Sequence, residues 1–405
     1  MNQIRRSLLT LISVGLVIRS AGNIFQPALS YLAEDLGLTQ VEATSNLTFY
    51  YFCLMLSFLF FGPICDRFPK NRLLQISLIG CFLGCILCGS ATEITIFNIG
   101  RCIQAFSAGL ALLSSQIWIG DQPDKKEMMK RLAWFSMIVS IAPILAPMLG
   151  GFISDWLSWR YDFWFILLMC IIGFTITILR PLSDVKKSKQ PTTTSPSGIL
   201  RDYRDTLRNL PIFSLSFGVQ ILFLGQSMFT SISSFLFIDE FGINASQLGL
   251  ISAGLLIIMV SARFPTLVLR KHYSARTVFL ICESLVLLSS LLAIGYYFIY
   301  GTHTMVEVIL LVALQIFGFS GLAILTANNI MLVGEEKKGT ASGLFNFLNQ
   351  ALSWLGVLTA QILYHINLSS SVIFQYMAII ILCGSLVAIF IFLKAYPTFK
   401  NQLEI

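Results

Sequence analysis

Charge is scarce in this chain, and that scarcity limits what the protein can be. Only 12% of its 405 residues are Asp, Glu, Lys or Arg, while 56% are hydrophobic. Such a composition cannot cover a folded core with the surface of a soluble protein. Histidine is rarer still, with three residues scattered at the ends of apolar stretches. No metal-binding spacing, G-x-S-x-G motif or phosphate-binding glycine loop occurs, so we expect no enzyme, no cofactor and no metal.

Cysteine is also missing where a disulfide framework would need it. All nine cysteines lie in or beside apolar stretches, and none lies in a connection predicted to face outward. The sequence therefore implies no disulfides. Cys85 and Cys88 form a C-x-x-C pair, but inside an apolar stretch, where small polarisable packing residues are expected rather than a redox pair.

Twelve apolar stretches fill the chain. A bilayer core of about 30 Å needs about 20 apolar residues per helix, and each stretch has roughly that length. Extra residues can be accommodated by tilt. We therefore predict an all-α integral membrane protein whose transmembrane helices cover residues 8–30, 45–65, 73–91, 96–118, 130–153, 161–179, 211–238, 246–268, 275–300, 304–331, 340–364 and 370–394.

Basic residues mark alternate connections between these stretches. Lys and Arg precede the first stretch and follow the second, fourth, sixth, eighth, tenth and twelfth, whereas the opposite connections hold only Arg160. Because basic loops stay on the cytoplasmic side, both termini are predicted in the cytoplasm. The net charge of +7 thus reflects topology and does not indicate a nucleic acid partner.

The longest connection divides the chain into two halves. It is rich in Pro, Ser, Thr, Lys and Arg, which cannot build a core. We predict an N-terminal six-helix half at residues 1–179, a cytoplasmic linker at 180–210, and a C-terminal six-helix half at 211–405.

A Gly–Pro–Asp–Arg order follows the second stretch, from Gly62 through Asp66 and Arg67 to Arg72. We expect a tight turn between two helices, in which Asp66 accepts hydrogen bonds at a helix end. A solvated basic loop would explain the lysine and arginines, but not this order. The segment resembles the major facilitator loop signature G-x-L-A-D-R-x-G-R-K. Pro69 replaces its second glycine, so the turn must differ locally.

Two further segments strengthen this resemblance. The fourth stretch opens with Gly100-Arg101-Cys102-Ile103-Gln104, similar to the family's R-x-x-Q-G motif, and the fifth contains A-P-I-L-A-P-M-L-G-G from Ala142 to Gly151. The latter resembles the antiporter motif of the bicyclomycin-resistance (Bcr/CflA) branch of drug exporters. The resemblance implies two six-helix halves that rock around a central cavity at mid-membrane. It also implies export coupled to protons.

The fifth stretch can be interpreted from its residues alone. Pro143 and Pro147 each remove a helical N–H donor and bend the helix. Gly150 and Gly151 then allow a neighbouring backbone to approach closely. These features suit a hinge that gates the cavity, although a kinked helix with only a structural role would look the same.

Two arginines are predicted at membrane depth in the first half. At 1.5 Å per residue, Arg19 lies about 18 Å from the inner edge and Arg101 about 9 Å from the outer edge. Arg19, Asn23 and Gln26 would share one helical face, and Arg101 and Gln104 another. We expect both faces to line the cavity. Alternatively, Arg19 reaches the outer surface and Arg101 binds backbone carbonyls.

Acidic groups depart from the family pattern. The position that is commonly Asp in this branch, a proton carrier, is Asn23 here. Glu42 follows Thr39 by three residues, so it is expected to form a capping box. Glu283 is the only deeply placed carboxyl; it could carry protons, but a structural hydrogen-bonding role is favoured.

The second half offers neutral polar stripes rather than charge. Gln220 and Ser227 on the seventh stretch, with Asn346 and Asn349 on the eleventh, are candidates for substrate binding. Such residues also bind helices to each other. Since uncompensated buried positive charge is costly, we expect an anionic small-molecule substrate.

The sequence therefore predicts a proton-coupled exporter in a bacterial inner membrane, surrounded by lipid and monomeric. Its substrate would be a drug or an endogenous anionic metabolite, such as a carboxylate siderophore. An importer or an uncoupled facilitator is the alternative within transport. A membrane enzyme or a sensor is the alternative outside it.

Overall fold

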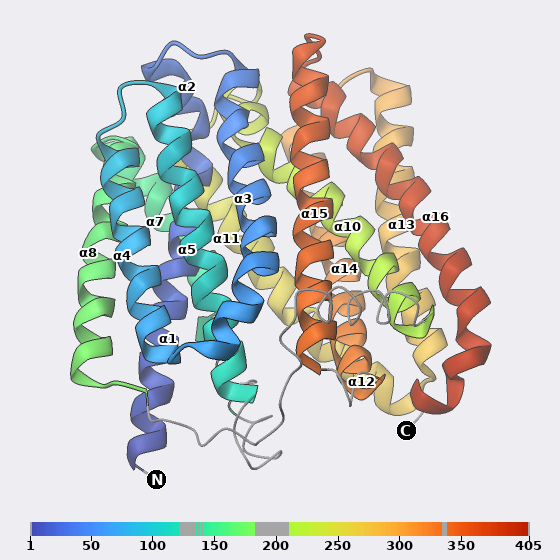
Figure 1. The fold of residues 1–405 in the computed structure, drawn as a ribbon. Coiled ribbons are helices and arrows are strands. Elements are labelled where there is room, and N and C mark those ends of the chain that lie inside the picture. Colours follow the sequence, from blue (N-terminus) through green and yellow to red (C-terminus); the bar gives the residue numbers. More distant parts are fainter. Residues whose placement is uncertain are drawn as a thin grey trace. The chain divides into compact units, whose positions relative to one another are not determined.

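Helices account for all the regular structure in the described part of the chain. The computed structural model describes residues 2–120, 131, 135, 138–139, 141–182, 210–333 and 338–403. Within those residues there is no strand (Figure 1). The predicted all-α membrane fold is confirmed.

The helices of the first half are α1 Asn2–Asn23, η1 Gln26–Ala28, α2 Leu29–Asp35, α3 Gln40–Arg67, α4 Lys70–Gly89, α5 Ile94–Gly120, α7 Ile141–Trp156 and α8 Arg160–Leu179. In this half, α3, α4, α5, α8 and the composite segment from α1 to α2 are each long enough to cross a bilayer, and α7 is shorter.

The second half follows the same plan. Its helices are α10 Leu210–Ser234, the π-helical turn η2 Phe235–Glu240, α11 Ala245–Ser261, α12 Arg263–His272, α13 Ala275–Tyr300, α14 Met305–Val333, α15 Lys338–His365 and α16 Ser370–Leu403.

These helices match the predicted spans one for one. Ten helical segments of the described residues are long and apolar enough to cross a membrane, and α7 is a shorter apolar helix. The predicted eleventh span coincides with α15. The first predicted span is a composite of α1, η1 and α2, because Pro27 cannot donate the hydrogen bond that a continuous helix requires.

The chain divides into two compact units. The first unit contains residues 1–194 and 243–253, and the second contains 195–242 and 254–405. In the first unit, α1 packs on α5, α7 and α8, while α4 packs between α5 and α8. In the second, α10 contacts α14, α15 and α16, and α13 packs on α14 and α16. The first turns of α11 thus belong with the first unit.

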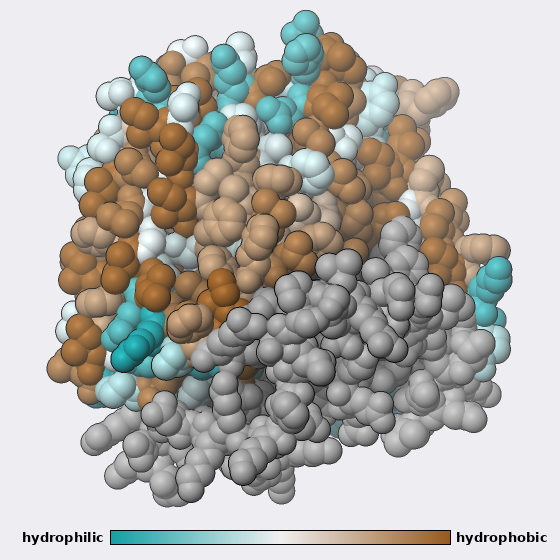
Figure 2. Space-filling view, in the orientation of Figure 1, coloured by the Kyte–Doolittle hydropathy of each residue, from teal (hydrophilic) through white to brown (hydrophobic). Residues whose placement is uncertain are grey.

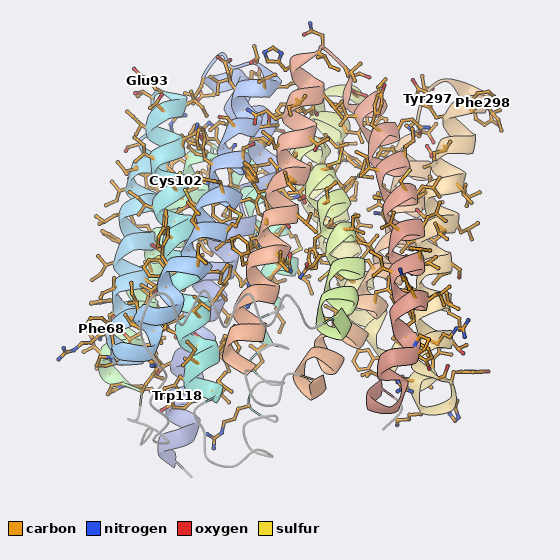
Figure 3. All side chains as sticks on the ribbon, turned by 45° about the vertical axis from the view of Figure 1, so that its right-hand side comes forward. Phe68, Glu93, Cys102, Trp118, Tyr297 and Phe298 are labelled. Atoms are coloured by element: carbon orange, nitrogen blue, oxygen red, sulfur yellow. The ribbon has the colours of Figure 1, made fainter. Side chains whose placement is uncertain are left out.

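The connection between α3 and α4 is shorter than predicted. Helix α3 continues through the Gly–Pro–Asp–Arg segment to Arg67, and the chain turns at Phe68 and Pro69. Phe68 is extended, as expected for a residue that precedes proline. Phe68 lies at one end of the unit and Glu93, in the next connection, at the other (Figure 3). At the start of α3, the predicted capping box between Thr39 and Glu42 is present.

Apolar side chains point outward along the helices. On α4 the exposed set is Ile76, Ile79 and Leu83, and on α13 it includes Leu288 and Leu292. Spacings of three and four place each set on one helical face. In Figure 2 hydrophobic residues likewise cover the flanks of the helices and hydrophilic residues gather near their upper ends. A lipid environment satisfies such faces, whereas water would not.

Candidate functional site

Arg101 of α5 is the largest side chain that is fully buried in the described structure, with 1% of its surface exposed. Its Nη1 donates to the backbone oxygen of Ala21 on α1 at 3.0 Å and to Oε1 of Gln104 at 2.8 Å. Its guanidinium also lies 4.3 Å from the ring centre of Tyr50. These partners are all neutral, so the positive charge is solvated but not compensated.

Arg19 of α1 lies near the same tyrosine. Its side chain is exposed, and the phenols of Tyr50 and Tyr51 on α3 are its electrostatic neighbours. Both arginines act electrostatically on Tyr50, so the two predicted basic residues lie within electrostatic reach of one phenol. Among the described residues, neither guanidinium forms an ion pair with a carboxylate.

The predicted stripe of Arg19, Asn23 and Gln26 is only partly correct. Asn23 is the last residue of α1, and its side-chain amide donates to the backbone oxygen of Arg19 at 2.7 Å. Gln26 begins η1 beyond an interrupted turn. The helical spacing therefore holds from Arg19 to Asn23 but not to Gln26, because the chain leaves the α-helix before Pro27.

Gln104 joins Arg101 to a different group. Its Oε1 accepts from Arg101, and its Nε2 donates to Sγ of Cys85 on α4 at 3.2 Å. Both polar ends of this buried amide are therefore occupied inside the first unit, so it does not line open space as predicted.

Helix α7 makes close contacts between backbones in its C-terminal half. A Cβ on Gly150 would lie 1.9 Å from the carbonyl oxygen of Ile24, and one on Gly151 would lie 2.2 Å from that of Ala245. No side chain fits at such distances. Pro147 lies inside α7, and its carbonyl oxygen meets Gly249 of α11 in the same way. Pro143 lies one turn before Pro147 on the same helix.

Asp155 joins three helical elements at this junction, although no sequence pattern predicted its role. Its Oδ1 accepts from the hydroxyl of Tyr31 at 2.8 Å and from the backbone N–H of Ala245 at 3.1 Å. Its Oδ2 accepts from the backbone N–H of Ser246 at 2.8 Å and from the Ser246 hydroxyl. A carboxylate at the first turn of α11 stabilises the orphan donors of that helix.

Asp162 at the start of α8 is a second acidic residue whose role no sequence pattern predicted. It is fully buried, and Oδ2 accepts from the hydroxyl of Ser154 on α7 at 3.0 Å. A signal was available: Asp155 lies in the short segment that joins the fifth and sixth predicted spans, and Asp162 lies in the first turn of the sixth.

In the second unit, the predicted polar residues occupy α10 and α15, which pack together. Gln220 is buried on α10, and Ser227 donates to the backbone of its own helix at Leu224. Asn346 and Asn349 are half-buried on α15. Oδ1 of Asn349 is shielded and has no hydrogen-bond partner among the described groups, so this helix keeps an acceptor available.

Glu283 of α13 is a buried carboxyl in the second unit. It is fully buried, and neither carboxylate oxygen forms a hydrogen bond to a described group. Its polar neighbour is Ser385 on α16. The structure therefore places it between α13 and α16, beside the hydroxyl of Ser385.

Other predicted residues fall outside these sites. The side chains of Gly62, Asp66 and Arg67, and most of the predicted linker, lie outside the described residues. The second unit also has an open surface groove, which contains none of the predicted site residues and is lined by Ser274, Arg276, Thr277, Leu280, Ile281, Ser284 and Tyr396.

Comparison with known families gives a match over nearly the whole chain. The sequence model described as Major Facilitator Superfamily matches residues 11–238 and 215–405. Solved structures agree on the fold. A peptide transporter POT in complex with sulfate superposes with a TM-score of 0.77 at 13% identity, covering 99% of this chain and 96% of that one. A D-xylose–proton symporter gives 0.72 at 14% identity, covering 96% and 97%.

Curated relatives match more locally. The chloramphenicol resistance protein CraA of Acinetobacter baumannii is 24% identical over 60% of this chain and 58% of its own length. A bicyclomycin resistance protein homolog of Haemophilus influenzae is 22% identical over 65% and 67%. Multidrug resistance protein D of Escherichia coli is 23% identical over 46% of each chain. The chain thus spans about half to two thirds of the length of these relatives.

Proposed function

Because this chain belongs to the Major Facilitator Superfamily, we propose that it is a secondary transporter that exports a small molecule by alternating access. The multi-pass helical fold supports transport across a membrane. The names of the relatives, which refer to chloramphenicol, bicyclomycin and multidrug resistance, support export. We place the protein in a bacterial inner membrane, with both termini in the cytoplasm, as a monomer.

In this proposal each of the two six-helix halves, residues 1–179 and 211–405, contributes different groups to substrate binding, and the linker 180–210 joins them. In this scheme the halves rock around a central cavity that holds the substrate. Arg19 and Arg101 of the first half would supply charge. Gln220, Ser227, Asn346 and Asn349 of the second half would supply neutral hydrogen bonds.

The observation that carries the substrate proposal is the surroundings of the two arginines. Arg101 is buried among neutral partners, Arg19 is accessible beside the same tyrosine, and neither has a described carboxylate partner. A substrate bearing a carboxylate or another anionic group would compensate that charge. In this arrangement the accessible Arg19 contacts the substrate, and the buried Arg101 orients Tyr50 and adds long-range attraction.

A neutral drug is the second candidate substrate, because the relatives are named for resistance to antibiotics. It would bind through the amide groups of the second half and the aromatic rings near Arg19. Under this alternative the arginines act in structure or coupling only, so their replacement would leave selectivity for charge unchanged.

Proton coupling has to use a route other than the first span. The position that would carry Asp in this branch is Asn23, whose amide bonds to the backbone of its own helix. Among the described buried groups, the unpartnered carboxyl of Glu283 is the candidate carrier that follows from the sequence. A buried carboxyl without donors favours its neutral form, which is the form a proton carrier delivers.

We propose that α7 works as the gate. Its glycines meet the backbone at Ile24 and Ala245 without side chains between them. The matched test is Gly150→Ala against Gly254→Ala, where no atom lies within 4 Å of the new Cβ. The first variant should lose transport and the second should retain it. Equal transport by both would remove α7 from gating.

The decisive experiment is transport in proteoliposomes with an imposed pH gradient, against anionic, neutral and cationic compounds. Export of anions driven by the gradient is expected. Arg19→Gln should abolish it, and Arg19→Lys should retain part of it because the charge remains. Movement of cations alone, or normal anion transport by Arg19→Gln, would contradict the anionic substrate.

The proton route is tested in the same vesicles. Glu283→Gln should remove the response to the pH gradient while leaving downhill movement of the substrate intact, because glutamine cannot titrate. If Glu283→Gln still responds to the gradient, the proton passes elsewhere.

A further inference from the structure

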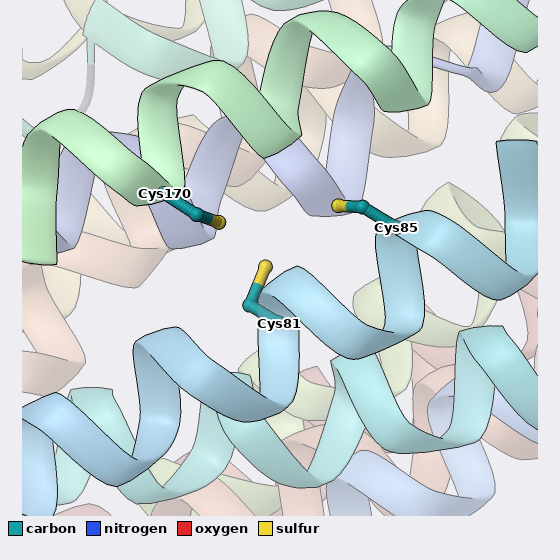
Figure 4. Close-up of side chains that lie close together, drawn as sticks. All are labelled: Cys81, Cys85 and Cys170. Atoms are coloured by element: carbon teal, nitrogen blue, oxygen red, sulfur yellow. The ribbon is translucent and has the colours of Figure 1, made fainter.

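Three cysteine side chains from two helices converge in the core of the first unit. Cys81 and Cys85 lie one turn apart on α4, and Cys170 faces them from α8 (Figure 4). Their sulfur atoms all lie within 4.8 Å of one another, and all three residues are buried. Cys88, the sequence partner of Cys85 in the C-x-x-C pair, is not part of this three-cysteine cluster: its thiol bonds to the carbonyl of Phe97.

The spacing of the sulfur atoms suits a single metal ion. For three atoms that are within 4.8 Å of one another, a point always exists that is no more than about 2.8 Å from each, and metal–thiolate bonds are about 2.3 Å long. A contraction of roughly half an ångström per sulfur would complete the site, which rotation of the cysteine side chains about χ1 can supply.

The side-chain amide of Gln104 links the three-cysteine cluster to Arg101 through hydrogen bonds. Nε2 of Gln104 donates to Sγ of Cys85 at 3.2 Å, while Oε1 of the same amide accepts from Arg101. Hydrogen bonds to a sulfur atom favour its thiolate, which is the form that binds metals. Such outer-shell partners orient and tune the ligands of metal sites. A cluster that served only to pack helices would need no such donor.

We propose that Cys81, Cys85 and Cys170 form a binding site for Cu(I). Soft thiolate ligands select this ion, and three sulfur atoms complete its coordination. Zinc would require a fourth ligand, and no further His, Cys or carboxylate among the described residues joins the group. The proposal departs from the packing role and the absence of metal that the sequence predicted.

The charges at the site balance. Two of the thiols release their protons to solvent when Cu(I) binds, and the third sulfur binds as a neutral thiol. The copper ion and two thiolates together carry one negative charge. Arg101, which reaches the cluster through Gln104 and has only neutral described partners, supplies the opposite charge. Pairing of buried charges of opposite sign lowers the cost of burying either one.

The test is an anaerobic titration of the purified full chain in detergent, with Cu(I) supplied as its coloured bicinchoninate complex. The background variant carries serine at the other six cysteines, 53, 65, 88, 102, 282 and 383, so only the three-cysteine cluster remains. It should withdraw one Cu(I) per chain. Adding Cys85→Ser or Cys170→Ser should weaken binding by more than about tenfold, and Gln104→Leu by about tenfold.

The control for folding is the thermal unfolding of each variant without copper. X-ray absorption of the unmodified chain with one Cu(I) bound should give three sulfur neighbours, which tests the site without any substitution. Failure to withdraw Cu(I), binding that survives Cys85→Ser, or a copper ion with nitrogen or oxygen neighbours would overturn the proposal. None of these measurements depends on transport, so the proposed function stands or falls separately.

Discussion

The two units place a carboxylate at the same point of their helix order, but give it different partners. In the first unit, Asp35 ends the first span and meets the start of the sixth: it accepts from Nε1 of Trp159 at 3.2 Å and pairs with Arg160. In the second, Glu240 ends the seventh span and meets the start of the twelfth. It accepts from the backbone N–H groups of Ser370 at 2.6 Å and Ser371 at 3.2 Å.

The buried ionisable groups differ in the same way. Arg101 of the first unit is bonded to a carbonyl, an amide and an aromatic ring, whereas Glu283 of the second has no hydrogen bond to a described group. An arginine cannot shed its proton inside a protein, so its burial requires acceptors. A carboxyl can become neutral, so it tolerates isolation. Each unit therefore buries its ionisable residue in the way that its chemistry allows: the arginine among acceptors, and the carboxyl without a described hydrogen bond.

The largest expected effect comes from Arg101→Met. It leaves the Ala21 carbonyl and the Gln104 amide oxygen without their donor, and each such loss costs about 1–3 kcal/mol. We expect the free energy of unfolding, measured by denaturant titration in mixed micelles, to fall by about 2–4 kcal/mol. An unchanged stability would mean that Arg101 is not bonded as described, and the contrast with Glu283 would disappear.

Glu240→Ala should come next. It leaves the first N–H groups of α16 without an acceptor, a loss of about 0.5–2 kcal/mol for a helix cap. Hydrogen exchange should accelerate at Ser370, Ser371 and the following turn of α16, and not in α13. Protection that is retained at both serines would show that another group caps the helix.

Asp35→Asn should have a smaller effect that depends on salt. The Asp35 side chain is 45% exposed and that of Arg160 is 29% exposed, and exposed ion pairs contribute about 0–1 kcal/mol. Thermal unfolding at low ionic strength should separate the variant from the parent, and about 1 M salt should remove the difference. Glu240→Ala is the matched comparison, because its loss should persist in salt.

Glu283→Gln should change stability least. A neutral carboxyl without hydrogen bonds loses nothing when an amide of similar shape replaces it, so we expect a shift within about 1 kcal/mol. Denaturant titration beside Arg101→Met makes the comparison. A loss as large as that of the arginine variant would reveal a partner for Glu283 that the described contacts lack.

Much of the fold and little of the site could be predicted from sequence. Hydropathy and the alternation of basic residues set the number of spans, because every backbone group in lipid must bond within its own helix. The family was correctly identified from short motifs, and Thr39-x-x-Glu42 correctly predicted a capping box. These features depend on local spacing, which a single sequence contains.

The site depends on contacts between segments that are distant in sequence. Arg101 bonds to Ala21, and Asp155 to Ala245 and Ser246; neither pairing has a local signature. The predicted position of Gln26 on the helical face of Arg19 was wrong because the prediction assumed an unbroken helix through Pro27. Cys170 could not be grouped with Cys81 and Cys85, since only the packing of α8 on α4 brings them together.

The glycine contacts of α7 have a mechanical consequence. Gly150 and Gly151 present bare main chain to bare main chain, so no ridges of side chain interlock across these contacts. Two backbone surfaces of this kind can separate and come together again without a change of side-chain rotamer. Asp155 accepts the shortest hydrogen bonds described at these contacts, so this one carboxylate would largely set how strongly α7 is held to α11.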